Sequence, residues 1–146
     1  MTIRKATIDH LGDLIPLFDG YRTFYKQESN LPKTKQFLLE RLKKNDSVIF
    51  MAYLEDNPVG FTQLYHLFSS VSMERMYLLN DLYVSDYCRG KGVGEALINK
   101  AKALCIAQKQ KGIAIQTAHD NPAQNLYQRL GFEPDSDLHF FWTNTH

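Results

Sequence analysis

A glycine-rich segment at residues 89–95 carries the most recognisable chemistry of this chain. It follows an apolar run that ends at Val84, and it precedes a segment in which apolar residues recur at helical spacing. The first N–H groups of a helix lack partners within the helix, and the helix dipole adds partial positive charge there. Glycines also let a ligand approach the backbone, so the segment predicts a turn that binds phosphate or pyrophosphate. The predicted donors are the amides of Gly90, Lys91, Gly92, Val93, Gly94 and Glu95, with charge added by Arg89 and Lys91.

Three known phosphate-binding patterns can be compared with this turn. The P-loop pattern G-x-x-x-x-G-K-[ST] does not occur in the sequence. The dinucleotide pattern G-x-G-x-x-G fits at Gly90 and Gly92, but Glu95 stands where its third glycine belongs. Residues 107–112 also lack the acidic residue that this pattern places about 20 positions later. The pattern R/Q-x-x-G-x-G/A fits at every position, with Arg89, Gly92 and Gly94.

A second segment, residues 121–132, lies about 30 positions further along the chain. Asn121 and Pro122 are expected to open a helix that carries Tyr127 and ends at Gly131. Together, the two segments resemble the motifs of the GNAT acetyltransferase superfamily in their order and spacing. The middle third of the chain most resembles the diamine (polyamine) acetyltransferases. The resemblance covers nearly the whole chain and implies an N-acetyltransferase that uses acetyl-coenzyme A.

Hydrophobic patterning predicts a fold of the same kind. It is an α/β fold with a mixed, mostly antiparallel sheet and helices on both faces, and the family resemblance implies a sheet splayed between strands 4 and 5. Strands are expected at residues 3–8, 48–54, 59–68, 73–84, 113–118 and 140–143, and helices near 11–18, 37–45, 93–112 and 122–131. Pro16 lies within the first helical pattern, so that helix is expected to begin late or to kink. The length predicts one domain, residues 1–146.

The family resemblance also implies how the coenzyme is held. The pantetheine arm would fill the gap between the strand before the turn and the next parallel strand, lined by Leu82, Tyr83 and Val84. A backbone N–H near Val84 would polarise the thioester carbonyl. Tyr127 would act as general acid toward the departing thiolate. The remaining implied cofactor contacts are Asn121, Ala123 and Gln124.

The sequence offers several candidates for the proton acceptor. Asn80 stands where the polyamine enzymes have a glutamate, and an asparagine side chain cannot take up a proton, which counts against a polyamine substrate. Asp81 follows, but neighbouring residues on a regular strand face opposite ways. Asn80 would then orient a water, or Asp81, Glu74 or His119 would serve, or the amine would lose its proton to solvent. The first two helices and the last loop are expected to build the acceptor site.

Composition limits the other possibilities. Lys and Arg number 17 against 16 Asp and Glu, which gives no bulk argument for a nucleic acid or an anionic membrane as partner. No apolar run approaches the ~18 residues of a membrane span, and the N-terminus lacks a signal-peptide core, so a cytoplasmic protein is expected. The two cysteines, Cys88 and Cys105, lack metal-ligand spacing, and no metal is expected. Members of the resembled family are often dimers, which makes a homodimer possible.

Three functions are therefore compared. The first is acetyl transfer from acetyl-coenzyme A to a primary amine of a small molecule or protein, by direct transfer in a ternary complex. The second is a non-catalytic module that binds acetyl-coenzyme A as a sensor or docking surface. The third, a dinucleotide-binding oxidoreductase fragment, is disfavoured by the incomplete glycine pattern. Retention of Tyr127 favours the first.

Overall fold

The computed structural model describes residues 1–145, which form two compact units. The first unit, Met1–Gln116, contains a single five-stranded sheet in the order β1-β2-β3-β4-β5. The strands are β1 (Thr2–Lys5), β2 (Ser47–Leu54), β3 (Asn57–Ser69), β4 (Glu74–Val84) and β5 (Ile113–Ile115). Neighbouring strands from β1 to β4 are antiparallel, and β5 is parallel to β4. The predicted mixed and mostly antiparallel sheet is confirmed.

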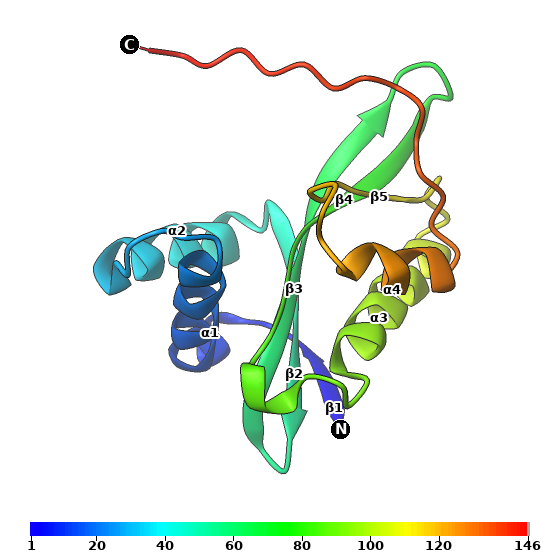
Figure 1. Ribbon diagram of the computed structural model, residues 1–146. Helices are drawn as coiled ribbons and strands as arrows, with labels where there is room; N and C mark the ends of the chain where they lie inside the picture. The colour runs from blue at the N-terminus through cyan, green and yellow to red at the C-terminus, as the bar shows by residue number, and fades with distance from the viewer. Residues whose placement is uncertain (146) are drawn as a thin grey trace. The chain divides into compact units, whose positions relative to one another are not determined.

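Helices cover both faces of this sheet, as expected (Figure 1). The short 3-10 helix η1 (Ile8–His10) leads into α1 (Leu11–Phe24), and α2 (Leu31–Lys44) follows. Phe18 of α1 packs on Phe61 of β3 with ring centroids 5.8 Å apart, which fixes the face that α1 covers. On the opposite face lies α3 (Val93–Ala107), whose Val93 and Leu97 approach Gly60 of β3. The main core is therefore built between α1, α2 and the strands β2 and β3.

The helix ends follow local sequence signals with one exception. The α1 helix continues through Pro16, and its buried side chains Leu11 and Leu14 match the predicted face. Asn45 ends α2 in the left-handed conformation (φ 53°), close to the predicted end. The α3 helix ends at Ala107, five residues before its predicted end at Gly112. Gly112 instead accepts a hydrogen bond from the Tyr77 amide at the start of the β4–β5 pairing.

The register between β3 and β4 contains a bulge at Asn80. Gln63 lies opposite Asp81, and Leu64 lies opposite Leu79, so the pairing skips Asn80. In a regular strand, side chains two positions apart share a face. Here Tyr77 reaches Gln108 just beyond α3, whereas Tyr83 packs against Tyr21 of α1. The bulge therefore moves Asp81 and Tyr83 from the α3 face to the α1 face.

The β4 and β5 strands are paired over only three residues. Tyr77, Leu78 and Leu79 lie opposite the three residues of β5, and β4 then continues to Val84 beyond the end of β5. Within the first unit, the segment of β4 after the bulge thus has β3 on one side and no paired strand on the other, which leaves an open edge. The parallel pairing of the fourth and fifth strands is as predicted, and it ends before the segment that leads to the glycine turn.

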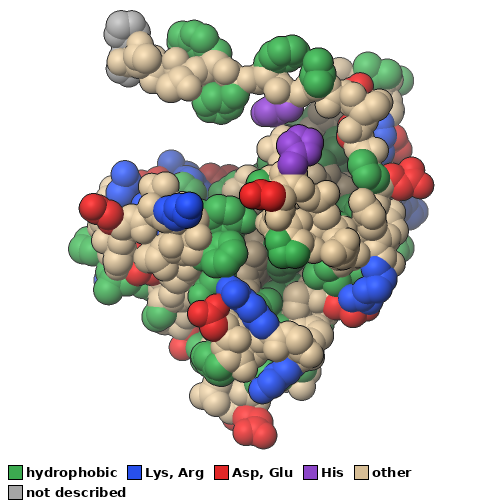
Figure 2. All heavy atoms as spheres, in the orientation of Figure 1, with side chains coloured by type: hydrophobic (Ala, Val, Ile, Leu, Met, Phe, Trp, Pro, Cys, Tyr) green, Lys and Arg blue, Asp and Glu red, His purple; other side chains and the backbone are tan. Residues whose placement is uncertain are grey.

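The second unit contains the short helix α4 (Ala123–Arg129). The Asn121 side chain accepts a hydrogen bond from the Ala123 amide (2.9 Å), and Gly131 follows the helix with a φ of 94°. The strand predicted at residues 140–143 is wrong, because these residues are in no strand. Phe140, Phe141 and Trp142 are each at least 80% exposed, and apolar side chains stand out on this extended segment in Figure 2.

Among the helices of residues 1–145, none has the length and the apolar character needed to cross a membrane.

Candidate functional site

The glycine turn lies between β4 and α3 and is held by two left-handed glycines. After β4, the 3-10 helix η2 (Asp86–Cys88) brings the chain around to Arg89. Gly90 and Gly92 have φ angles of 78° and 79°, a region that side chains other than glycine disfavour. The Ala96 amide donates to the Gly92 carbonyl (3.0 Å) and forms the first hydrogen bond of α3. Glycine at these two positions thus follows from the shape of the turn itself.

The amides of this turn are available to a ligand. Within residues 1–145, the N–H groups of Gly90, Lys91, Gly92, Val93 and Gly94 donate no hydrogen bond. They lie at the positive end of a 15-residue helix, where the helix dipole favours an anion. Glu95 is the acidic residue of the first turn of α3. A phosphate or diphosphate suits this arrangement of donors.

Arg89 connects the turn to the end of β4 and to α1. Its Nε donates to the Val84 carbonyl (3.2 Å), and its guanidinium pairs with Asp86 (3.0 Å). The same guanidinium lies over the ring of Phe24 at 5.2 Å from the centroid. Arg89 therefore fixes the shape of the turn in addition to supplying the charge that was predicted.

The open edge of β4 presents backbone amides beside the turn. Ser85 donates its N–H to the Val59 carbonyl of β3 (2.8 Å). In an antiparallel pair, successive residues point their backbone groups to alternate sides. The amides of Leu82 and Val84 therefore point away from β3, toward the edge where β5 has ended. This is the geometry that an extended polar chain needs in order to pair with a strand.

The α1 side of the same segment is aromatic. Tyr83 packs against Tyr21 and Phe61 with ring centroids 6.3 and 6.5 Å apart. Tyr21 also stacks edge-on against Tyr25 at 5.1 Å. The side chain of Tyr83 thus faces α1, while its neighbours Leu82 and Val84 place their amides at the open edge.

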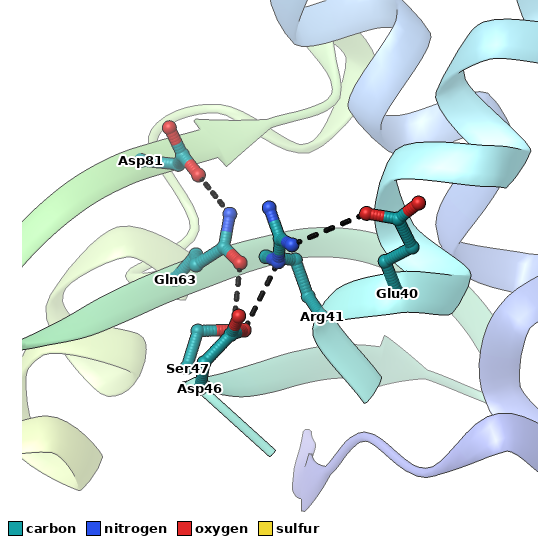
Figure 3. A network of polar contacts seen from close by, with 6 residues as sticks. All are labelled: Glu40, Arg41, Asp46, Ser47, Gln63 and Asp81. Carbon is teal, nitrogen blue, oxygen red and sulfur yellow. Dashed lines mark hydrogen bonds and ion pairs between the residues drawn. The ribbon is translucent and has the colours of Figure 1, made fainter. Parts of the chain in front are cut away.

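Asp81 is a buried carboxylate in the middle of this region (Figure 3). Its exposed fraction is 3%, and burial raises its pKa. Oδ2 accepts from Nε2 of Gln63 at 2.5 Å, and Oδ1 accepts from Nδ2 of Asn80 at 2.8 Å. These two amide donors, together with Tyr21, offset part of the increase in pKa. Asp81 therefore holds a proton more readily than an exposed aspartate.

Asn80 and Tyr21 lie at the outer side of this carboxylate. Asn80 is exposed, and its backbone oxygen accepts from the Tyr21 hydroxyl (3.3 Å). Burial and the charge of Asp81 raise the pKa of Tyr21, so its phenol keeps its proton at neutral pH. A regular strand would have turned Asn80 and Asp81 to opposite faces. The bulge places both beside α1, and the expectation of opposite faces is wrong.

The candidate proton acceptors occupy different parts of the chain. Glu74 is the first residue of β4, ten positions before Val84, so about 33 Å of strand separates them. Asp81 is only three positions from Val84 on the same strand. His119 belongs to the second unit. Of the candidates in the first unit, Asp81 therefore lies much nearer to Val84 along β4 than Glu74 does.

The remaining predicted site residues belong to the second unit. The side-chain Nε2 of Gln124 donates to the carbonyls of Ala118 (3.2 Å) and His119 (2.5 Å), and so closes the loop before α4. The ring of Tyr127 packs edge-on against Phe132 at 6.3 Å, and its carbonyl accepts from the Phe132 amide. Together with the Asn121 cap, these contacts account for the local fold of the motif.

Two residues of the network were not predicted from the sequence. Gln63 is fully buried, and its Oε1 accepts from the Ser47 hydroxyl at 2.8 Å. Their pairing depends on the register of β2, β3 and β4, which is not evident from the sequence alone. The one available signal was the occurrence of polar residues within apolar strand segments.

Comparison with known proteins defines the class. Residues 45–134 match the model of the acetyltransferase (GNAT) domain. The chain is 41% identical over 145 residues to the uncharacterized N-acetyltransferase YhfO of Bacillus subtilis, covering 99% of this chain and 97% of that protein. It is 35% identical over 134 residues to a probable acetyltransferase of Haemophilus influenzae, with coverage of 91% and 88%.

A solved structure agrees with this assignment. The crystal structure of a probable acetyltransferase superimposes with a TM-score of 0.93 and 36% identity, covering 100% of this chain and 99% of that chain. The chain belongs to the GNAT acetyltransferase family. The predicted α/β GNAT fold is confirmed, whereas the closer likeness to the diamine enzymes is not established.

Proposed function

We propose that this protein transfers the acetyl group of acetyl-coenzyme A to a primary amine of a small molecule or protein, directly within a ternary complex. The observation that carries the proposal is a set of five backbone N–H groups, from Gly90 to Gly94, that donate no hydrogen bond within residues 1–145 and lie beside the open edge of β4. A diphosphate fits the first feature and an extended pantetheine arm fits the second. Both belong to one molecule, coenzyme A.

The binding roles follow from this geometry. The amides of the turn hold the diphosphate, with Arg89 and Lys91 adding charge. The amides of Leu82 and Val84 pair with the pantetheine arm in place of a strand, and the Val84 N–H donates to the thioester carbonyl oxygen. Asn121, Ala123 and Gln124 keep their predicted role as further cofactor contacts.

The transfer step needs one proton acceptor and one proton donor. The neutral amine attacks the carbonyl carbon, a C–N bond forms, and the C–S bond breaks to release the thiolate. We assign uptake of the amine proton to Asp81, because its pKa is raised and it lies three residues from Val84. Tyr127 is assigned protonation of the thiolate. Positioning of the amine supplies much of the remaining acceleration.

The acceptor remains a primary amine without further definition. Although the middle third resembles the diamine enzymes, Asn80 replaces their glutamate, and this counts against a polyamine. A cytoplasmic location and a homodimer belong to the same proposal and rest on the sequence and the family.

The proposal is tested by binding and turnover measured separately. Acetyl-coenzyme A and coenzyme A should raise the melting temperature, whereas NAD should not. A panel of amines with thiol release as the readout then tests transfer. Binding without release for any amine would support the non-catalytic sensor instead, and the absence of binding would overturn the assignment of the turn.

A matched pair of variants isolates the role of the turn. Gly92→Asn tolerates the left-handed conformation and adds bulk, while Gly92→Asp adds the same bulk and a negative charge. We expect Gly92→Asp to abolish coenzyme A binding and Gly92→Asn to weaken it less. Equal affinities for the two variants would mean that no anion binds at this turn.

A further inference from the structure

We propose that Gln63 is a positioning residue that keeps Oδ2 of Asp81 permanently occupied, so that Asp81 takes up the proton of the acceptor amine on Oδ1. This inference rests on the proposed function, since it requires Asp81 to be the proton acceptor. It concerns residues of one sheet in the first unit, and Figure 3 shows the contacts of Gln63 with Ser47 and Asp81.

The two oxygens of Asp81 have different partners. Oδ2 faces Gln63, which is fully buried within the sheet and bonded at 2.5 Å. Oδ1 faces the side chain of Asn80, an exposed residue at the bulge, at 2.8 Å. A buried donor held on both sides cannot move aside, whereas an exposed asparagine side chain can rotate to other partners. Oδ1 is therefore the oxygen that can become free to receive a proton.

The Gln63 amide is also bonded at its other end. Its Oε1 accepts from the hydroxyl of Ser47, which is itself buried, at 2.8 Å. A serine hydroxyl can donate or accept, so it is the ionised carboxylate, which can only accept, that requires Nε2 to face Asp81. If the amide were reversed, two acceptor oxygens would meet in the interior, which is unfavourable. As long as the carboxylate is ionised, the two hydrogen bonds therefore run one way: Ser47 donates to Gln63, and Gln63 donates to Asp81.

The groups around Asp81 provide little charge compensation. Tyr21 of α1 and Tyr65 of β3 interact with Asp81. The titratable and charged groups around these two tyrosines are Tyr25 directly after α1, Arg41 at the end of α2, Asp46 before β2 and Tyr83 of β4. Arg41 is paired with Asp46 (3.0 Å) and contacts Glu40 (3.5 Å). Burial and Asp81 raise the pKa of Tyr65 to about 12, so it stays neutral. Neutral amide donors are therefore the main stabilisation of the ionised carboxylate.

A neutral donor to a carboxylate favours its ionised form, so removal of this donor should raise the pKa of Asp81. Gln63→Leu removes the donor while keeping a side chain of similar size. We expect the acid limb of the kcat/KM profile to move upward by about one pH unit, as befits the loss of one charge-assisted hydrogen bond. The carbon-13 NMR titration of the Asp81 carboxyl, which needs no substrate, should show the same shift.

Ser47 supplies a matched pair that disturbs the core less. Ser47→Ala removes the second bond that restrains the Gln63 side chain and should move the acid limb upward by a smaller amount. Ser47→Thr keeps the hydroxyl and should leave the acid limb near the wild-type value. The positioning role would be overturned if both Gln63→Leu and Ser47→Ala kept the wild-type acid limb of kcat/KM and the wild-type NMR titration of Asp81. This holds even if their melting temperatures fall. The wild-type enzyme tests the proposed function separately, because its thiol release does not depend on these variants.

Discussion

The backbone of Gly60 and the carbonyl oxygen of Tyr83 approach each other so closely that a Cβ atom at position 60 would lie 2.7 Å from that oxygen. The same Cβ would lie 3.2 Å from Val93 of α3. Position 60 thus has no room for a side chain between the backbone of β4 and the first turn of α3. The close approach helps to place the end of β4 against the start of α3, where the open edge and the glycine turn meet.

Gly60→Ala should therefore destabilise the protein and weaken coenzyme binding together. The added methyl group forces β4 or α3 to shift, at a cost of about 1–3 kcal/mol. Thermal unfolding should show a melting temperature lower by about 2–4 °C for each kcal/mol lost. Gly12→Ala is the control, since nothing lies within 4 Å of its Cβ in α1, and it should stabilise by about 0.5–1 kcal/mol. A variant at position 60 with normal melting and normal affinity would contradict this account.

Asp81→Asn should lower kcat/KM by roughly 10²- to 10³-fold, because it removes the proposed proton acceptor. In the wild type, kcat/KM should fall at acid pH with an apparent pKa above the ordinary aspartate value of about 3.9, since burial raises the pKa of this group. The variant should lose this limb. Asp13→Asn, which alters a carboxylate bonded to Tyr53 in another part of the unit, serves as control and should keep the wild-type profile.

The same carboxylate should make stability depend on pH. Since the pKa of Asp81 is higher in the folded than in the unfolded chain, the stability associated with this group is complete below the unfolded pKa. It is lost as pH rises through the folded pKa. Urea unfolding measured from the ordinary aspartate pKa of about 3.9 upward should show this loss in the wild type and a smaller one in Asp81→Asn. Parallel curves for the two proteins would mean that Asp81 titrates alike in both states.

Most of the fold, but less of the site, can be predicted from the sequence. Helical spacing from Leu11 to Phe18 and the left-handed position at Asn45 are local signals, and both correspond to the structure. The glycine turn is local too, because its φ angles demand glycine at Gly90 and Gly92. The bulge at Asn80 depends on the alignment of two strands and leaves no local signature, so the sequence alone predicts, wrongly, that Asn80 and Asp81 face opposite ways. Residues 140–143 have strand-like composition, but a strand also requires a neighbour with which to pair.

Arg89→Lys tests whether this residue shapes the turn or only supplies charge. Lysine keeps the charge but cannot reproduce the planar guanidinium that joins the Val84 carbonyl, Asp86 and the ring of Phe24. We expect calorimetry to show coenzyme A affinity reduced by about tenfold in Arg89→Lys, corresponding to about 1.4 kcal/mol. Arg89→Ala should be only slightly weaker. Wild-type affinity in the lysine variant would assign Arg89 a purely electrostatic role.

Tyr127→Phe should lower kcat by about 10²-fold and leave the KM for acetyl-coenzyme A nearly unchanged. The phenol is assigned to the departing thiolate, and its loss affects the step in which the C–S bond breaks rather than binding. Because the ring packs against Phe132, phenylalanine should preserve the local fold of α4, and melting temperatures should agree within experimental error. Tyr53→Phe is the matched control, since it removes a phenol that donates to Asp13 (2.9 Å) and should reduce stability without a comparable loss in kcat. If thiol release by Tyr127→Phe equals that of the wild type across the amine panel, protonation of the thiolate must come from solvent or another group.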